Sequence, residues 1–161
     1  MASTIIDSIE KEIPRLRRFA RCLTRDAERA DDIVQQSLLR AVDKTDAWQP
    51  GNNLRTWLLA LVRNCYIDEV NRARQRPVAN GAALHGQWPG ESQEQQIALG
   101  GIRDAFLRLE EEHREILLLV VVEGLDYQVA ADILMIPVET VRSRLSCARQ
   151  ALLCACADQA G

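Results

Sequence analysis

Polar side chains gather on one face of a helix that the sequence predicts over residues 138–156. Its apolar residues recur at intervals of three and four, which directs them toward a core: Val138, Val141, Leu145, Ala148 and Leu152. The residues left outside are Glu139, Thr140, Arg142, Ser143, Ser146 and Arg149. Polar groups near the start of such a helix can hydrogen-bond base edges in a DNA major groove.

A short helix, expected over residues 126–134, precedes this one after the break Met135-Ile136-Pro137. Two helices of these lengths around so short a break have the proportions of a helix-turn-helix. Small and apolar residues of the first helix, Ala131, Ile133 and Leu134, would pack across the second. An ordinary helical hairpin with a solvated polar face explains this segment equally well. The segment alone therefore leaves both interpretations open.

Residues for catalysis or metal binding are sparse. The sequence lacks the GxxxxGK[ST], HExxH, GxSxG and dinucleotide glycine motifs, and His85 and His113 are its two isolated histidines. Cys154 and Cys156 lie closer together than the usual zinc spacing of about two to four intervening residues. The five cysteines are odd in number and scattered, which argues against a disulfide framework. We therefore predict no enzyme, no metal site and no cofactor.

The elements that must position the polar residues are helices. The 161 residues are 47% apolar but only 4% aromatic, and apolar positions recur with helical spacing. Asp26 can cap a helix, and Pro50 and Pro77 mark interruptions. Helices are expected over 4–23, 28–45, 53–75, 97–109 and 113–123, the last containing an apolar run suited to a buried core. No apolar run reaches the ~18 residues of a membrane span, and no secretory signal is evident, so we expect a cytoplasmic protein.

The composition changes between residues 77 and 92, where Asn-Gly and Pro-Gly pairs replace the helical pattern. The sequence therefore predicts an all-α fold of two small helical domains, 1–76 and 93–161, joined by a flexible linker over 77–92. The first domain carries 14 Lys and Arg against 11 Asp and Glu, and the second carries 6 against 11. Net charges of +3 and −5 are weak for a protein that binds DNA unaided, because phosphate neutralisation dominates such binding.

Three segments together resemble the extracytoplasmic-function (ECF) sigma factors. Residues 127–145 (YQVAADILMIPVETVRSRL) resemble the family's minus-35-reading helix-turn-helix. Residues 30–41 (ADDIVQQSLLRA) resemble its helix that grips the polymerase clamp, and residues 54–72 its minus-10-reading helix. The entry to that helix, residues 48–54 (WQPGNNL), resembles the general-stress-response branch. The three segments occur in the family's order along the chain, and a linker like the family's separates the first two from the third.

The resemblance implies an alternative sigma factor, and with it a set of partners. Its partners would be core RNA polymerase, through the beta-prime clamp helices and the beta flap, promoter DNA and an anti-sigma factor. It assigns polymerase binding to Asp32, Gln35 and Gln36, and minus-10 DNA to Asn52, Asn53, Arg63, Asn64, Arg72 and Arg76. It assigns binding of minus-35 DNA to Glu139, Thr140, Arg142, Ser143, Ser146 and Arg149. Trp57 could stack on a base, but its helical spacing with neighbouring leucines favours a core role.

Several departures from the family pattern bear on DNA reading. Met135 stands where the family's turn has glycine, and a non-glycine residue with positive φ there costs on the order of 1 kcal/mol. Glu139 replaces a glycine and Cys147 an arginine, which weakens the basic surface. Two alternatives follow: a sigma-like decoy that binds an anti-sigma factor without reading promoters, and an independent helix-turn-helix repressor. A decoy usually carries a receiver domain of roughly 120 residues, and a repressor a dimerisation element; neither is present in the sequence.

Overall fold

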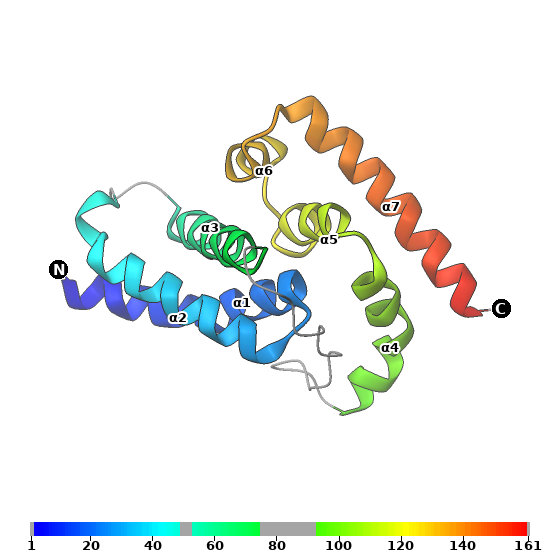
Figure 1. Ribbon diagram of the computed structural model, residues 1–161, viewed down its shortest axis with the longest axis horizontal. Helices are drawn as coiled ribbons and strands as arrows, with labels where there is room; N and C mark the ends of the chain where they lie inside the picture. Colours follow the sequence, from blue (N-terminus) through cyan, green and yellow to red (C-terminus); the bar gives the residue numbers. More distant parts are fainter. Residues whose placement is uncertain (1, 49–52, 75–92, 161) are drawn as a thin grey trace. The chain divides into compact units, whose positions relative to one another are not determined.

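The computed structural model describes residues 2–48, 53–74 and 93–160, and these form helices joined by short turns (Figure 1). The chain divides into two compact units, Met1–Gly86 and Gln87–Gly161. Within the described ranges there is no strand, so the predicted all-α fold with two helical domains is confirmed. None of the helices in these ranges is long and apolar enough to cross a membrane.

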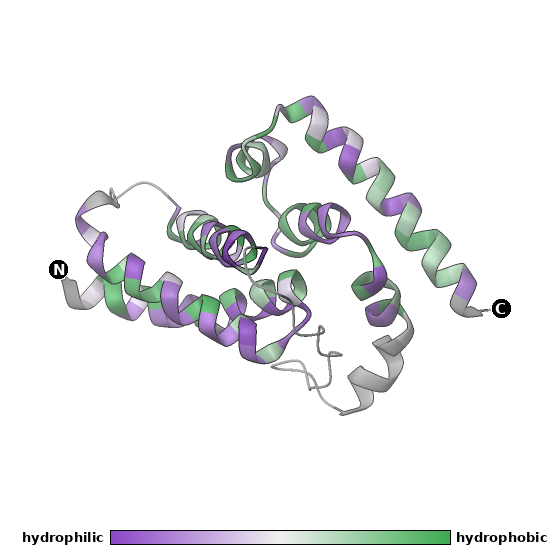
Figure 2. Cartoon of the chain, viewed as in Figure 1, coloured by the Kyte–Doolittle hydropathy of each residue, from purple (hydrophilic) through white to green (hydrophobic). Residues whose placement is uncertain are grey.

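Unit 1 is a bundle of three helices, α1 (Ala2–Thr24), α2 (Ala27–Asp43) and α3 (Leu54–Ala73). Each helix packs against the other two. Their fully buried side chains form one core: Leu16, Phe19 and Leu23 from α1, Ile33 from α2, and Leu58, Leu59 and Val62 from α3. Green and purple bands alternate along α2 in Figure 2, as expected for a helix with one buried stripe. The periodicity of the sequence therefore located this core.

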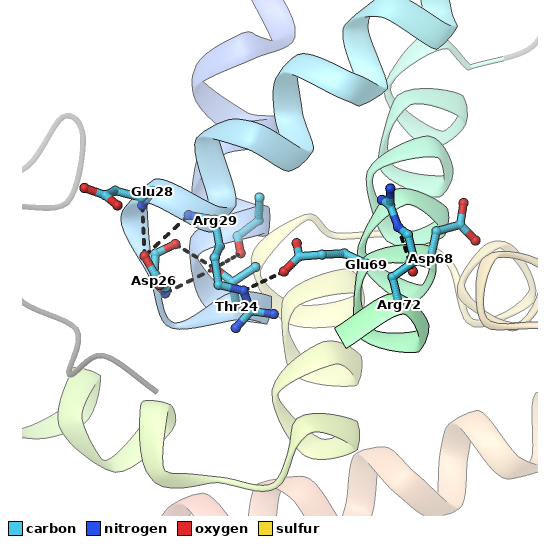
Figure 3. A network of polar contacts seen from close by, with 8 residues as sticks. Thr24, Asp26, Glu28, Arg29, Asp68, Glu69 and Arg72 are labelled. Carbon is cyan, nitrogen blue, oxygen red and sulfur yellow. Dashed lines mark hydrogen bonds and ion pairs between the residues drawn. The ribbon is translucent and has the colours of Figure 1, made fainter. Parts of the chain in front are cut away.

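The turn between α1 and α2 is short and held by side chains (Figure 3). Arg25 adopts a left-handed conformation with φ 57°, and its N–H donates to the Arg21 carbonyl at 2.8 Å. The Asp26 carboxylate then accepts hydrogen bonds from the N–H groups of Glu28 (3.0 Å) and Arg29 (3.4 Å). The predicted capping role of Asp26 is confirmed. Because a cap satisfies N–H groups that the helix leaves open, it fixes where α2 begins.

Ion pairs join α3 to the other helices of unit 1. Arg29 Nε lies 2.6 Å from Glu69 Oε1, and Arg40 Nη2 lies 3.1 Å from Asp68 Oδ2, so two pairs tie α2 to α3. A third pair joins α3 to α1, where Arg55 Nε lies 3.0 Å from a carboxylate oxygen of Glu12. The side chains are partly exposed, so each pair adds little stability.

Unit 2 contains α4 (Gln93–Arg108), α5 (Glu111–Leu117), α6 (Tyr127–Leu134) and α7 (Val138–Ala160). The long helix α7 packs against α4, α5 and α6. Its Val141, Leu145 and Ala148 are buried, as predicted, whereas Val138 and Leu152 are only half-buried. Ala131, Ile133 and Leu134 of α6 are buried as well. The two helices α6 and α7 form the predicted helix-turn-helix.

The expected helix over 113–123 is corrected by the structure. The α-helix ends at Leu117, and residues Leu118–Val122 form a π-helical turn in which the Glu123 N–H donates to the Leu118 carbonyl at 2.8 Å. A π turn holds more residues than an α turn, so later side chains rotate away from the buried face. Leu118 and Leu119 remain buried, but Val121 and Val122 are exposed. The apolar run is therefore core in its first part only.

Candidate polymerase and DNA interfaces

The residues predicted to bind polymerase lie on α2, beginning six residues after its Asp26 cap. Asp32 and Gln35 are exposed, and Gln36 is half-buried. Asp32 and Gln35 are three residues apart and share a helix face, which is the arrangement that a docking surface needs. The structure therefore leaves this face of α2 open to a partner.

Two apolar residues missed by the sequence analysis continue the same face. Leu39 follows Gln35 by four residues and is 68% exposed; Val42 follows by seven and is 48% exposed. Positions separated by three, four and seven residues share a helix face. The buried stripe of α2 runs through Ile33, Val34 and Ala41, so Leu39 and Val42 do not contribute to the core of unit 1. Apolar residues that lie off the buried stripe are the sequence signal that could have located this face. We call Asp32, Gln35, Leu39 and Val42 the α2 face.

The predicted minus-10 residues that the structure describes come mainly from α3. Asn64 and Arg72 are exposed and lie eight residues apart on one side of the helix, whereas Arg63 beside them is half-buried. Trp57, predicted to be core, is half-buried. Asn52 and Arg76 lie outside the described residues. The structure thus brings Asn64 and Arg72 together on an open stripe.

Asn53 has a local role that sequence analysis did not assign. It is the N-cap of α3, and its side-chain oxygen accepts hydrogen bonds from the N–H groups of Arg55 (3.0 Å) and Thr56 (3.4 Å). Asparagine is a favoured N-cap because its amide oxygen replaces a missing helical acceptor. The cap uses that oxygen, so base contacts by the exposed Asn53 would come from its NH₂ group.

The predicted minus-35 residues lie along the first half of α7. Glu139, Arg142, Ser143, Ser146 and Arg149 are exposed, and Thr140 is half-buried, less open than predicted. Cys147 is exposed between them. Arg144 is engaged elsewhere, since its Nη2 lies 3.6 Å from Glu112 of α5. Among the described residues, the exposed cations left on this face of α7 are therefore Arg142 and Arg149.

The turn before α7 keeps the conformation that glycine favours, although methionine occupies it. Met135 has φ 58° and ψ 44°, in the left-handed region, and it ends α6 with its N–H donating to the Ala131 carbonyl. Its side chain is 84% exposed. The Pro137 carbonyl accepts from the N–H groups of Thr140 (3.0 Å) and Val141 (3.2 Å) and starts the next helix. The turn therefore tolerates the strained residue without being reshaped.

Matches to known proteins cover both units. The Sigma2 domain of PhyR matches residues 9–63, and Sigma-70, region 4 matches residues 99–152. The ECF RNA polymerase sigma factor EcfG of Rhodopseudomonas palustris (strain TIE-1) is 36% identical over 94% of this chain and 84% of its own. The chain belongs to the ECF RNA polymerase sigma factors. Such proteins are DNA-binding regulators of transcription rather than enzymes.

Other ECF sigma factors and solved structures agree with this membership. SigC of Mycobacterium tuberculosis (strain CDC 1551 / Oshkosh) is 35% identical over 80% of this chain and 70% of its own. The sigma factor RpoE of Bartonella quintana, solved with the anti-sigma factor NepR, matches with a TM-score of 0.78 and 28% identity over 94% of this chain and 96% of that one. CnrH, solved with the cytosolic domain of CnrY, matches at 20% identity and TM-score 0.65 and shares the fold.

The matched segments bear differently on the two candidate DNA surfaces. The region 4 match contains α6, the turn and α7 as far as Leu152, and with them every residue of the predicted minus-35 surface. The sigma2 match contains the α2 face but ends at Arg63, so Asn64 and Arg72 lie beyond it. Assignment of α3 to DNA therefore depends on its exposed polar stripe.

Within the described ranges, no three His, Cys, Asp or Glu side chains cluster closely enough to hold a metal ion, and all five cysteines are free.

Proposed function

We propose that this ECF sigma factor binds core RNA polymerase and directs promoter-specific initiation, reading the minus-10 element with unit 1 and the minus-35 element with unit 2. The observation that carries the proposal is family membership along nearly the whole chain, combined with exposed polar helix faces on α2 and α7 inside the matched segments and on α3 beyond the sigma2 match. In sigma terms, residues 1–76 are region 2, 77–92 the linker and 93–161 region 4. Both regions act in the cytoplasm, where polymerase is found.

The α2 face supports a polymerase contact through the beta-prime clamp helices. It combines a carboxylate and an amide with two exposed aliphatic side chains, and such mixtures of apolar anchors and polar groups are typical of protein interfaces. Region 4 would dock on the beta flap, which holds α7 over the minus-35 element. Polymerase then supplies most of the nonspecific DNA affinity that the weakly charged chain lacks.

An anti-sigma factor is the third proposed partner. RpoE was solved with the anti-sigma factor NepR, and this chain resembles RpoE along 94% of its length. The resemblance of residues 48–54 supports placing the chain in the general-stress-response branch, and the matches to PhyR and EcfG agree with that placement. Such an inhibitor would cover the surfaces that polymerase and DNA need.

The test is in-vitro transcription with purified core polymerase, this chain and a randomised promoter library. Specific transcripts that share minus-10 and minus-35 motifs are expected. The matched variant replaces Asp32 and Gln35 with alanine, which should reduce both transcript yield and co-purification with core while helicity is unchanged. Undiminished co-purification of that variant would remove α2 from the interface. No specific transcripts, together with binding to an anti-sigma factor, would instead identify a decoy.

A further inference from the structure

A negative charge lies in the middle of the proposed minus-10 surface. Asn64, Asp68 and Arg72 follow one another at intervals of four on α3 and are all exposed, so they form one stripe. The proposed function assigns the first and last of them to promoter DNA. An unpaired carboxylate between them would repel the phosphates that the stripe is meant to approach. The surface therefore needs something that offsets the charge of Asp68.

That offset comes from the neighbouring helix. Arg40 of α2 places its Nη2 3.1 Å from Asp68 Oδ2, with side chains that are 39% and 50% exposed. Arg72 cannot serve the same purpose in this arrangement, because its Nε donates to the backbone carbonyl of Asp68 at 3.4 Å rather than to the carboxylate (Figure 3). The second pair between these helices, Arg29 with Glu69, lies one residue off the stripe.

We propose that Arg40 is a positioning residue for minus-10 reading: its guanidinium holds the Asp68 carboxylate against α2 and neutralises it, which leaves Asn64 and Arg72 free to approach DNA. This inference rests on the proposed function of α3. Ion pairs at this exposure contribute little to folding. The consequence of losing Arg40 is therefore electrostatic, and it falls on DNA affinity more than on stability.

The experiment measures binding of reconstituted holoenzyme to fork-junction DNA that carries the minus-10 element selected from the library by the wild type. Arg40→Ala should weaken binding about three- to tenfold, the effect expected for one uncompensated charge several ångströms from a phosphate in a solvated site. The loss should shrink as salt is raised, because screening shortens the reach of the exposed charge. Adding Asp68→Asn to Arg40→Ala should restore affinity to within about twofold of wild type.

Two control variants separate position from net charge and from loosened packing. Arg40→Ala with Glu28→Gln has the same net charge as the rescued variant, but Glu28 lies twelve residues away along α2, about 18 Å. It should not restore binding. Arg29→Ala removes the other pair between α2 and α3 and should leave affinity within about twofold of wild type. Co-purification with core shows that each variant is folded.

The outcomes distinguish the possible errors. Unchanged binding by Arg40→Ala refutes the inference, and so does loss that Asp68→Asn fails to restore, since Arg40 would then contact DNA directly. Restoration by Glu28→Gln also refutes it, because only net charge would matter. Alanine at Asn64 and Arg72 provides the separate check on α3. If those variants lose affinity while Arg40→Ala does not, the positioning role alone fails; if they bind as wild type, the assignment of α3 to DNA fails with it.

Discussion

Replacing Met135 with glycine should stabilise the helix-turn-helix, which is unusual for a substitution that removes a whole side chain. Met135 occupies the left-handed region with φ 58° and ψ 44° at the end of α6. In that region the Cβ of a non-glycine residue crowds the backbone, whereas glycine adopts the conformation freely. The side chain is 84% exposed, so its removal forfeits little buried area. Strain should therefore decide the sign of the effect.

The size of the gain follows from two opposing effects. Relief of the left-handed strain is worth roughly 1–2 kcal/mol. Glycine also gives the unfolded chain more freedom, which offsets about 0.4–1 kcal/mol of that gain. The expected net stabilisation is about 0.5–1 kcal/mol, or roughly a two- to fivefold change in the opening equilibrium. Gly124 offers the reverse case: its φ is 67°, and a Cβ there would meet nothing within 4 Å, so Gly124→Ala should destabilise through backbone strain alone.

Hydrogen exchange measured peptide by peptide suits a chain with two units, because it reports the opening of α6 and α7 separately from unit 1. Under conditions where exchange follows the opening equilibrium, amides of residues 127–148 should exchange about two- to fivefold more slowly in Met135→Gly. Met135→Ala keeps the Cβ and should stay close to wild type. Equal protection in the alanine and glycine variants, or faster exchange in the glycine variant, would refute the argument from strain.

Three further predictions concern the proposed interfaces. Arg142→Ala should relax base preference in holoenzyme binding to minus-35 variants, at about 1–3 kcal/mol if the contact is bidentate to guanine, whereas Arg149→Ala should weaken all promoters nearly equally; identical preferences in Arg142→Ala and wild type would contradict this. Asn53→Asp keeps the N-cap acceptor, so the thermal stability should be unchanged. Loss of the NH₂ group and the added negative charge should reduce transcription, and an unchanged transcript yield would exclude a base contact by Asn53. Leu39→Ala should change stability by less than about 0.5 kcal/mol yet weaken core binding in a titration, and full core affinity would remove Leu39 from the interface.

Local signals in the sequence were sufficient for some features and not for others. The helical spacing of Val141, Leu145 and Ala148 predicted their burial, because periodicity is a property of one helix and its buried side. Asp26 was predicted as a cap for the same reason: its partners are the next few N–H groups. The pair of Arg40 with Asp68 was not predictable in this way. It joins residues 28 apart, and only the packing of α2 on α3 brings them together.

Two other features were missed because the residue type alone does not decide where the side chain lies or what it binds. Asn53 is suited both to capping a helix and to contacting a base, and the sequence cannot show that its amide oxygen is already used. The valines at the end of the apolar run look like core residues. The π turn that carries Val121 to the surface depends on a backbone hydrogen bond from the Glu123 N–H to the Leu118 carbonyl, and the spacing of side chains does not reveal it.

The charges of unit 2 limit what its helix-turn-helix can do alone. Residues 93–161 have a net charge of −5, and the exposed face of α7 proposed to read DNA offers Arg142 and Arg149, with Glu139 exposed in its first turn. Even if both arginines contacted phosphates, the slope of log K against log salt would be only about −1.8, whereas proteins with about 6–10 phosphate contacts show a far steeper dependence. So few contacts can select among promoters only when another protein delivers the helix to DNA. Under the proposed function, occupancy of promoters depends on how tightly α2 binds polymerase, and an inhibitor that covers the α2 face is expected to block minus-10 and minus-35 reading together.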